Sequence, residues 1–180
     1  QLKVEKNDFD FYINYLKEHD VEVAITASTG IAATHMGGMT IHAWSGMGIR
    51  DHISDYDIDQ MEEKKYLWDR YDKVKVLIID EISMLSGGFL DNLDRICRSF
   101  KRNPEVPFGG IQVILCGDLF QLPPISRTEN SSGLVIDSLA WKNSHFVVCY
   151  ITEQHRQDDS RFTEILNAVR TNNLSDEHFE

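Results

Sequence analysis

Apolar residues along the chain gather into short runs that are rich in Val and Ile and are bounded by polar or turn-forming residues. Four runs stand out: Val21–Thr26, Val74–Ile79, Ile111–Cys116 and Phe146–Ile151. Continuous apolar runs of this length are typical of strands that are buried on both faces, as in a parallel sheet. The pattern therefore predicts four buried strands.

Between and around these runs, apolar residues recur at spacings of three and four, which is the period of an amphipathic helix. The segments are Phe9–Glu18, Phe89–Phe100 and Arg161–Arg170. An alternation of strands and helices predicts an α/β fold in which a parallel sheet is flanked by helices. Ligands of such sheets bind at the carboxyl ends of the strands, so functional residues are expected directly after each strand.

Polar clusters do follow the four predicted strands in this way. They are Ser28-Thr29-Gly30, Asp80-Glu81, Gly117-Asp118 and Glu153–Gln157. Four clusters at equivalent positions indicate one binding edge to which several strands contribute.

The segment Arg50–Arg70 does not fit the alternation, because it is first acidic and then holds a short helical stretch, Gln60–Arg70. One interpretation is a small subdomain inserted into the fold. The other is a long surface connection with a satisfied helix, and the pattern alone favours neither.

Length and composition indicate one domain, residues 1–180, in a reducing intracellular compartment. A chain of 180 residues with 42% hydrophobic content can bury a sizeable core. No apolar stretch reaches the roughly 20 residues that cross a bilayer, and Gln1–Asp10 is too polar for a signal peptide. Cys97, Cys116 and Cys149 are few, odd in number and far apart, each in an apolar context, which predicts buried thiols rather than disulfides or metal ligands.

The net charge of −11 argues against a uniformly basic nucleic-acid-binding protein, because phosphate attraction favours an excess of Lys and Arg on the binding face. The acidity is local, however. The acidic cluster consists of Asp51, Asp55, Asp57, Asp59, Glu62 and Glu63, and a basic cluster consists of Arg95, Arg98, Lys101 and Arg102. Net charge therefore leaves the partner open.

Residues 76–81, Val-Leu-Ile-Ile-Asp-Glu, are an apolar strand that ends in two adjacent carboxylates, the Walker B pattern of nucleoside triphosphatases. In that chemistry one carboxylate holds Mg²⁺, directly or through water, and its neighbour orients or deprotonates the attacking water. Asp80 would take the first role and Glu81 the second. The alternative is an acidic pair that caps the following helix, since carboxylates suit helix N-termini.

Residues 114–124, Ile-Leu-Cys-Gly-Asp-Leu-Phe-Gln-Leu-Pro-Pro, are the most distinctive stretch of the chain. Gly117 permits a tight exit from the strand, and the proline pair stiffens the loop. Gln121 is thereby held as a neutral amide that can bond both a terminal phosphate and its attacking water. A plain strand-exit turn is the alternative, but it would not require Gln followed by Leu-Pro-Pro.

Residues 27–33, Ala-Ser-Thr-Gly-Ile-Ala-Ala, and residues 37–42, Gly-Gly-Met-Thr-Ile-His, combine small residues, hydroxyls and glycines after the first predicted strand. Backbone amides and hydroxyls there can reach nucleic-acid phosphates without local basic charge. The alternative is an N-capped helix followed by a Gly-rich turn. Trp44, close behind, either stacks on a base or belongs to the core.

Arg156 lies in Gln154–Gln157, after the fourth predicted strand and before an amphipathic segment. An arginine here can point at the terminal phosphate of a nucleotide as an internal arginine finger. The alternative is a surface arginine at a helix start, so this assignment depends on the other motifs.

Taken in order and spacing, these motifs resemble those of the Pif1-type DNA helicases, which are RecD-like motors of superfamily 1. The matching stretches are residues 27–33, 40–42, 78–85, 108–112, 117–124 and 155–157, with Phe162 and Leu166-Asn167. The resemblance runs from about Val21 to Glu180, and the Gly-Asp-Leu-Phe-Gln-Leu-Pro-Pro element is its most specific part.

The resemblance implies the RecA-like P-loop NTPase fold and an enzyme that uses ATP and Mg²⁺ to move 5′ to 3′ along single-stranded DNA and to unwind duplex junctions. It makes Asp80 and Glu81 the metal-binding Walker B pair, Gln121 the γ-phosphate sensor and Arg156 an arginine finger, all four of them catalytic and nucleotide-binding. It places Ser28, Thr29, Gly30, Thr40 and His42 in elements that approach single-stranded DNA. Segment 50–70 would be the small wedge subdomain.

Two departures from the family pattern shape the expected function. The family carries a Gly-x-x-x-x-Gly-Lys-Ser/Thr loop ahead of the first strand, whereas Lys3–Tyr12 contains no glycine. That loop supplies the amides and the lysine that cradle the phosphates. The family also has a second RecA-like domain, for which no sequence follows Glu180. We therefore expect part of a helicase motor that is inactive alone.

Two other hypotheses are compatible with the sequence. In the first, the chain is a catalytically inactive module of the same fold that binds single-stranded DNA. In the second, it is an unrelated P-loop ATPase such as a phage terminase or AAA-type enzyme. The latter would share Asp80 and Glu81 but gives no reason for Gln121 and the residues after it. The expected location is intracellular: cytoplasmic in a prokaryote or virus, nuclear or mitochondrial in a eukaryote.

Overall fold

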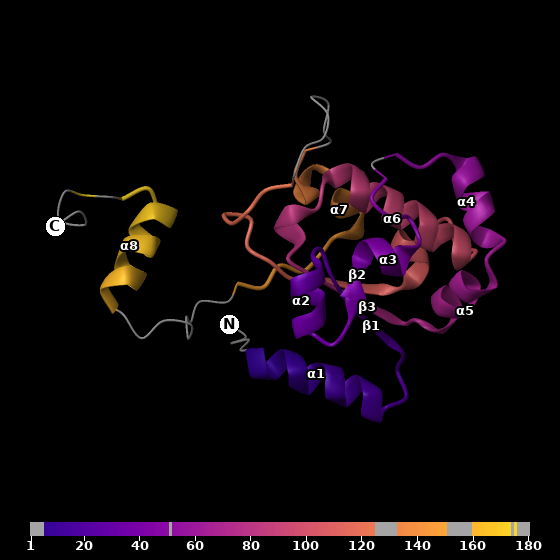
Figure 1. Cartoon of the computed structure of the whole chain (residues 1–180), viewed down its shortest axis with the longest axis horizontal. Helices are drawn as coiled ribbons and strands as arrows, with labels where there is room; N and C mark the ends of the chain where they lie inside the picture. The colour runs from indigo at the N-terminus through magenta and orange to yellow at the C-terminus, as the bar shows by residue number, and fades with distance from the viewer. Residues whose placement is uncertain (1–5, 51, 125–132, 151–159, 174, 176–180) are drawn as a thin grey trace. The chain divides into compact units, whose positions relative to one another are not determined.

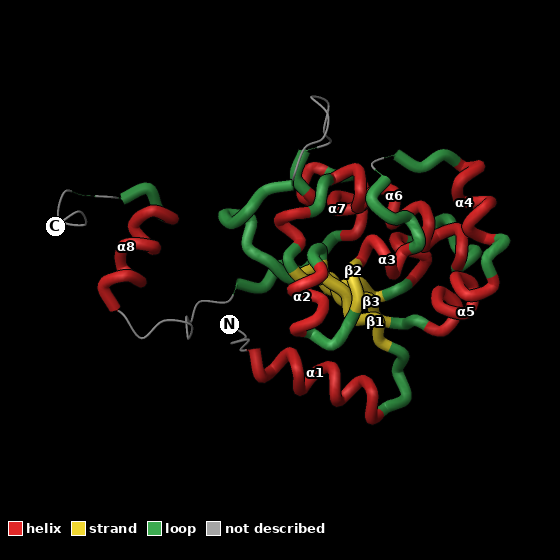
Figure 2. The backbone as a smooth tube through the Cα atoms, viewed as in Figure 1, coloured by secondary structure: helices red, strands yellow, loops and turns green. Residues whose placement is uncertain are grey.

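The fold is built on a sheet of four parallel strands (Figures 1 and 2). The computed structural model describes residues 6–50, 52–124, 133–150, 160–173 and 175. Residues 10–147 form one compact unit, which holds the sheet, and residues 1–9 with 148–180 form a second unit. The described residues of the second unit include helix α8, Ser160–Arg170, which is close to the predicted Arg161–Arg170.

The strands are β1 (Val23–Ala27), β2 (Met39–Thr40), β3 (Val76–Asp80) and β4 (Gln112–Leu115), arranged in the order β2-β1-β3-β4. Three of the four predicted strands are therefore confirmed, as is the α/β class. In register, Ala27 pairs with Asp80, and Ile79 pairs with Leu115. Strands β1, β3 and β4 thus end at the same edge of the sheet.

The apolar run of β3 explains its central position. Its first four residues, Val76 to Ile79, are each at most 3% exposed, so both faces of the strand are covered. A parallel sheet needs such a strand because elements pack on both of its faces. In Figure 2 the strands lie side by side at the middle of the unit, with helices around them.

Most of the helices that surround the sheet begin at a residue whose side chain caps the helix. They are α1 (Lys6–Glu18), α2 (Gly30–His35), α3 (Ile41–Ser45), α4 (Asp55–Glu62), α5 (Lys65–Lys73), α6 (Gly87–Phe100) and α7 (Leu139–Ser144). Short 3₁₀ turns are η1 (Ile82–Met84), η2 (Pro107–Gly110) and η3 (Val135–Asp137). The predicted helices over Phe9–Glu18 and Phe89–Phe100 correspond to α1 and α6. For α6, Ser86 caps the start by accepting a bond from the Phe89 N–H over 3.1 Å.

Segment 50–70 forms α4 and most of α5, two helices where one helical stretch was expected. Met61, Leu67 and Tyr71 on these helices are each at most 1% exposed and belong to the same core as the sheet residues. Tyr71 stacks on Phe100 of α6 with ring centroids 4.4 Å apart. The segment is therefore packed into the core, and its role as a wedge stays a prediction.

The fourth predicted strand, Phe146–Ile151, is wrong for the residues that the structure describes, because residues 146–150 form no strand. Phe146 instead packs against Trp141, with ring centroids 5.0 Å apart, while Val147 and Tyr150 are exposed. An apolar run becomes a strand only where a neighbouring strand completes its hydrogen bonds. Ile151 lies outside the described residues.

The cysteines agree with the expectation only in part. Cys97 is buried and Cys116 is half-buried, but Cys149 is exposed. Within the described ranges all three thiols are free. None of the helices in these ranges is long and apolar enough to cross a membrane.

Candidate functional site

Asp80 lies at the end of β3 and connects two strand ends. Its carbonyl oxygen accepts a bond from the Ser28 N–H over 3.0 Å, which ties the exit of β1 to that of β3. Its side-chain Oδ1 accepts from the Glu81 N–H over 2.9 Å. The carboxylate is half-buried and keeps its second oxygen for a ligand.

Glu81 has a left-handed backbone conformation, with φ 56° and ψ 46°. This conformation costs a residue with a side chain on the order of 1–3 kcal/mol, and such strain gathers at functional sites. Glu81 occupies the N-cap position of η1, yet its side chain makes no capping bond. Its carboxylate has no hydrogen-bond or ion-pair partner among the described residues. The helix-capping interpretation of the acidic pair is therefore wrong for Glu81.

The exit of β4 lies directly against this turn. The Cys116 N–H donates to the Ile79 carbonyl over 2.9 Å, and the Ile82 N–H donates to the Cys116 carbonyl over 3.0 Å. Gly117 has φ +154°, and a Cβ at this position would lie 2.9 Å from the Ile82 nitrogen. Glycine is required here by the close approach of two strand exits, which agrees with the predicted tight exit.

Gln121 lies four residues beyond Gly117, in a turn that Asp118 organises. The Gln121 N–H donates to the Asp118 carbonyl over 3.0 Å. Oδ1 of Asp118 accepts from the Phe120 N–H over 3.1 Å, and Oδ2 accepts from the Gln121 side-chain Nε2 over 3.2 Å. The sequence hypothesis attributed the placement of Gln121 to the glycine and the prolines and missed the role of Asp118. The signal was present, since Asp commonly bonds the backbone two residues ahead in turns.

Cys116 lies at the exit of β4, and the pKa of its thiol is strongly raised there. Burial raises its pKa to about 12, and the negative charge of Asp80 adds to the effect. Cys116 is therefore a protonated, unreactive thiol. Asp80 is close enough to the end of β4 for its charge to act there.

The hydroxyls of Thr29 and Thr40 act as helix caps. Oγ1 of Thr29 accepts from the Ala32 N–H over 3.3 Å at the start of α2, whose first residue is Gly30. Oγ1 of Thr40 accepts from the Ala43 N–H over 3.2 Å at the start of α3. The capped-helix alternative is thus correct for both threonines. A hydroxyl that accepts a capping bond still has a proton to donate, so capping and phosphate binding are compatible.

The remaining residues predicted to contact DNA lie close to Thr29 and Thr40 in sequence but differ in exposure. Oγ of Ser28 is buried and has no partner in the part of the chain that the structure describes. His42 is half-buried, and its ring lies 4.7 Å from that of Phe89. Trp44 is only 4% exposed and lies against Tyr71, with ring centroids 4.9 Å apart. Base stacking by Trp44 is therefore wrong, and the core alternative is correct.

The structure brings together Asp80, Glu81 and the β4 exit that leads to Gln121, and it ties Ser28 to the same edge. Arg156 lies outside the described residues, so its predicted position stays a prediction. Within those residues no group of three or more His, Cys, Asp or Glu side chains could hold a metal ion. A lone pair of carboxylates suits Mg²⁺, which binds through one or two carboxylates together with water and phosphate oxygens.

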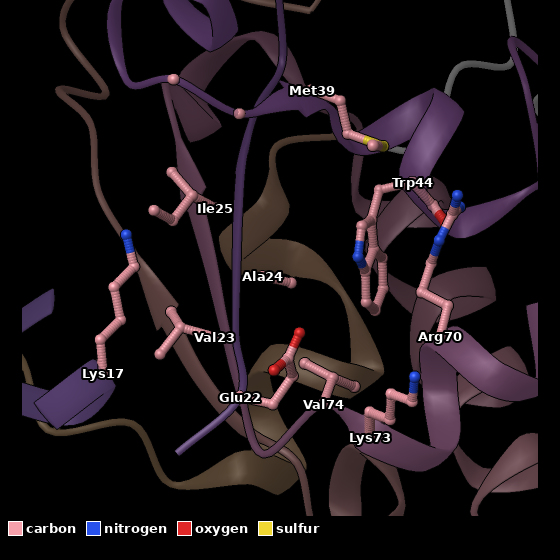
Figure 3. Close-up of a pocket in the computed structure, with 12 residues that line it drawn as sticks. Lys17, Glu22, Val23, Ala24, Ile25, Met39, Trp44, Arg70, Lys73 and Val74 are labelled. Carbon is pink, nitrogen blue, oxygen red and sulfur yellow. The ribbon is translucent and has the colours of Figure 1, made fainter. Parts of the chain in front are cut away.

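A hollow of about 430 Å³ lies away from this edge, beside the first residues of β1 (Figure 3). Lys17, Glu22, Trp44, Arg70 and Lys73 line it together with β1 backbone and apolar side chains. Gly37, Gly38 and Met39 of the stretch 37–42 line it as well, whereas Asp80, Glu81 and Gln121 do not. The strand ends, where these predicted nucleotide-binding residues lie, are therefore the candidate functional site.

Known proteins are similar to this chain over most of its length. The sequence model of the PIF1-like helicase family matches residues 9–178. The ATP-dependent DNA helicase Pif1 of Psychrobacter sp. is 48% identical over 171 residues, covering 90% of this chain and 26% of that protein. The ATP-dependent DNA helicase RRM3 of Saccharomyces cerevisiae is 43% identical over 155 residues, covering 85% of this chain and 21% of that protein. The chain thus spans about a quarter of the length of these curated relatives.

Solved structures are similar in fold as well as in sequence. The Pif1 helicase from Candida albicans superposes with a TM-score of 0.84 at 36% identity, over 94% of this chain and 38% of that one. The Pif1 helicase from Bacteroides in complex with ADP-AlF3 and ssDNA gives a TM-score of 0.76 at 34% identity, over 87% of this chain and 38% of that one.

Proposed function

The chain belongs to the PIF1-like helicase family, and we propose that it forms part of the first RecA-like motor domain of an ATP-dependent DNA helicase. That helicase would move 5′ to 3′ along single-stranded DNA and open duplex junctions. The observation that carries the proposal is the pair Asp80 and Glu81 at the end of the buried strand β3, with the Glu81 carboxylate unpartnered among the described residues.

In this function Asp80 would hold Mg²⁺ with the carboxylate oxygen that the Glu81 N–H leaves available. Bound Mg²⁺ would neutralise charge on the phosphate oxygens of ATP. Glu81 accepts a proton from, or orients, the water that attacks the γ-phosphate. Its side chain makes no capping bond at the start of η1, so the carboxylate stays available for the water.

Gln121 and Arg156 complete the proposed catalytic set. Gln121 is an exposed neutral amide on the turn that follows β4, so it can bond the γ-phosphate and the attacking water together. Arg156 would stabilise the charge that develops on the transferred phosphoryl group. Its role rests on the sequence motif and the family.

Single-stranded DNA is proposed to contact Ser28, Thr29, Gly30, Thr40 and His42. The helix starts at Thr29 and Thr40 present backbone N–H groups and hydroxyl protons, which bind phosphate oxygens without a basic side chain. A surface of this kind is consistent with a net charge of −11. Segment 50–70 is proposed to act as the wedge at the duplex junction.

The phosphate-binding loop and a second RecA-like domain are proposed to come from the rest of the helicase that contains this chain. The proposal is supported by the share of about a quarter that the chain covers in its relatives, and by the absence of a Gly-Lys-Ser/Thr sequence in it. The site of action would be wherever that helicase meets DNA, in a prokaryotic cytoplasm or in a nucleus or mitochondrion.

Substitution of Glu81 in the helicase that contains this chain tests the proposal. DNA-stimulated ATP hydrolysis should fall about 100-fold or more in Glu81→Gln, because a general base contributes a factor of this order. Binding of ATP and of single-stranded DNA should persist. Glu105→Gln is the matched control, since Glu105 is exposed and lies between α6 and η2, ahead of the start of β4. Hydrolysis within twofold of wild type in Glu81→Gln would reject the assignment.

The alternative function is a catalytically inactive module that binds single-stranded DNA. Its support is the same missing glycine-lysine loop. The two functions separate in one measurement: the module binds oligonucleotide while the helicase that contains it shows no hydrolysis attributable to Glu81.

A further inference from the structure

We propose that Asp118 is a positioning residue that decides which end of the Gln121 side-chain amide faces the nucleotide. The inference rests on the proposed ATPase function and goes beyond it, because it assigns a separate role to a residue that need not touch the substrate. Its basis is the set of three bonds between Asp118 and the two residues at the end of the turn.

Two of these bonds fix the backbone of the turn. The Asp118 carbonyl accepts from the Gln121 N–H over 3.0 Å, and Oδ1 of Asp118 accepts from the Phe120 N–H over 3.1 Å. Together they set where the Gln121 Cα lies relative to the end of β4. Any residue that forms an Asx turn could provide this part of the geometry.

The third bond concerns the side chain itself. Oδ2 of Asp118 lies 3.2 Å from the Gln121 Nε2 atom. An ionised carboxylate only accepts hydrogen bonds, and the Gln121 amide has one end that donates and one that accepts. The NH₂ end must therefore face Asp118, and Oε1 must turn away from it.

This orientation has a chemical consequence for ATP hydrolysis. The Oε1 atom that turns away from Asp118 can accept a bond from the attacking water. The second N–H of Nε2 remains available for a phosphate oxygen. Gln121 is exposed, so without Asp118 its amide would rotate among several orientations and would lose entropy on each binding event. Asp118 holds the productive orientation in advance.

Asparagine at position 118 separates this role from simple turn formation. In Asp118→Asn the side-chain carbonyl can still accept from the Phe120 N–H, so the turn is kept. The new NH₂ group would face Gln121 and attract Oε1, which would turn the glutamine amide around. In Asp118→Ser the hydroxyl can also accept from the Phe120 N–H, but it is too short to reach Nε2.

The experiment measures DNA-stimulated ATP hydrolysis by the helicase that contains this chain. We expect kcat to fall about tenfold in Asp118→Asn and in Asp118→Ser, with KM for ATP changed less than twofold, because only the reacting geometry is disturbed. In a Gln121→Ala background neither substitution should lower kcat further, since residues that act as a unit are not additive.

Two outcomes would overturn the inference. One is wild-type kcat in both Asp118 variants, which would leave Asp118 a turn residue only. The other is an equal fall of kcat in the presence and absence of Gln121. A wild-type helicase that does not hydrolyse ATP would overturn the proposed function as well. Hydrolysis that is lost in Glu81→Gln but kept in both Asp118 variants overturns this inference alone.

Discussion

The backbone N–H of Ile82 donates to the carbonyl oxygen of Cys116 over 3.0 Å. Ile82 directly follows Glu81, and Cys116 directly precedes Gly117, so this bond joins the turn after β3 to the exit of β4. The carboxylate proposed as base and the loop that carries Gln121 are thereby held in one rigid arrangement. A change at the crossing point should disturb both.

Gly117→Ala tests this arrangement. The new Cβ would lie 2.9 Å from the Ile82 nitrogen and 3.1 Å from its Cγ1 atom, and both contacts are too close. We expect the free energy of unfolding to fall by about 1–3 kcal/mol, the usual cost of overpacking, as measured by urea denaturation of the chain. Gly30→Ala is the matched control, because nothing lies within 4 Å of its added Cβ. Equal midpoints for the two variants would contradict the close approach.

Much of the fold could be predicted from the sequence because continuous apolar runs mark the buried strands β1, β3 and β4. The run at Phe146–Ile151 has the same composition but fails in residues 146–150, where the structure has no strand beside it. Strand β2 is only two residues long and its first residue, Met39, is exposed, so it leaves no periodic pattern to detect. In residues 146–150 the hydrophobic pattern predicts neither burial nor pairing, since Val147, Val148 and Tyr150 are exposed.

The candidate site was predictable in residue type but not in geometry. Asp80 and Glu81 were identifiable because a buried strand that ends in carboxylates has few structural explanations. The left-handed backbone of Glu81 was not identifiable. The turn that holds it is joined to the exit of β4 by a bond between Ile82 and Cys116, which lie 34 residues apart in sequence. The bond from Gln121 to Asp118 was missed for a different reason. It depends on the turn conformation, which motif spacing does not specify.

Segment 50–70 offers a test of whether α4 and α5 fold together with the sheet. Leu67 is completely buried in the shared core. We expect Leu67→Ala to lower the free energy of unfolding of the whole unit by about 2–5 kcal/mol, in a single transition. Tyr66→Ala is the control, because Tyr66 is 57% exposed on the same helix. A separate early transition, with the main midpoint unchanged, would instead indicate an independent subdomain.

The thiols should differ strongly in reactivity. Burial, and then the charge of Asp80, raises the pKa of Cys116 from 9.0 to about 12, so its thiolate fraction at pH 8 is about a thousandfold smaller than that of an ordinary cysteine. Cys149 is exposed. Iodoacetamide should therefore modify Cys149 first and leave Cys97 and Cys116 unmodified until the chain unfolds, as mass spectrometry of peptides would show. Early modification of Cys116 would contradict its burial between the exits of β3 and β4.

The same pKa shift predicts the direction of a pH effect on stability. The unfolded chain releases the Cys116 proton near pH 9, whereas the folded chain holds it to about pH 12. The stabilising contribution is complete below pH 9 and is lost as the pH rises toward 12, because the unfolded state gains by ionising there. In Cys116→Ala this part of the decline should be absent. An identical alkaline stability profile for wild type and variant would argue against the shift.

Binding of single-stranded DNA tests the proposed phosphate contact of Thr40 at the start of α3. The double variant Thr40→Ala/His42→Ala should lower affinity at low salt about five- to 150-fold, since each of the two lost polar contacts is worth roughly 0.5–1.5 kcal/mol. Thr40→Ser keeps a capping hydroxyl and should bind nearly as wild type. Thr34→Ala is the control, because the Thr34 hydroxyl donates to the Gly30 carbonyl over 2.9 Å and is not a cap. If the double variant binds as tightly as Thr34→Ala across a salt titration, the DNA path does not cross α3, and the helix start at Thr29 becomes the remaining candidate.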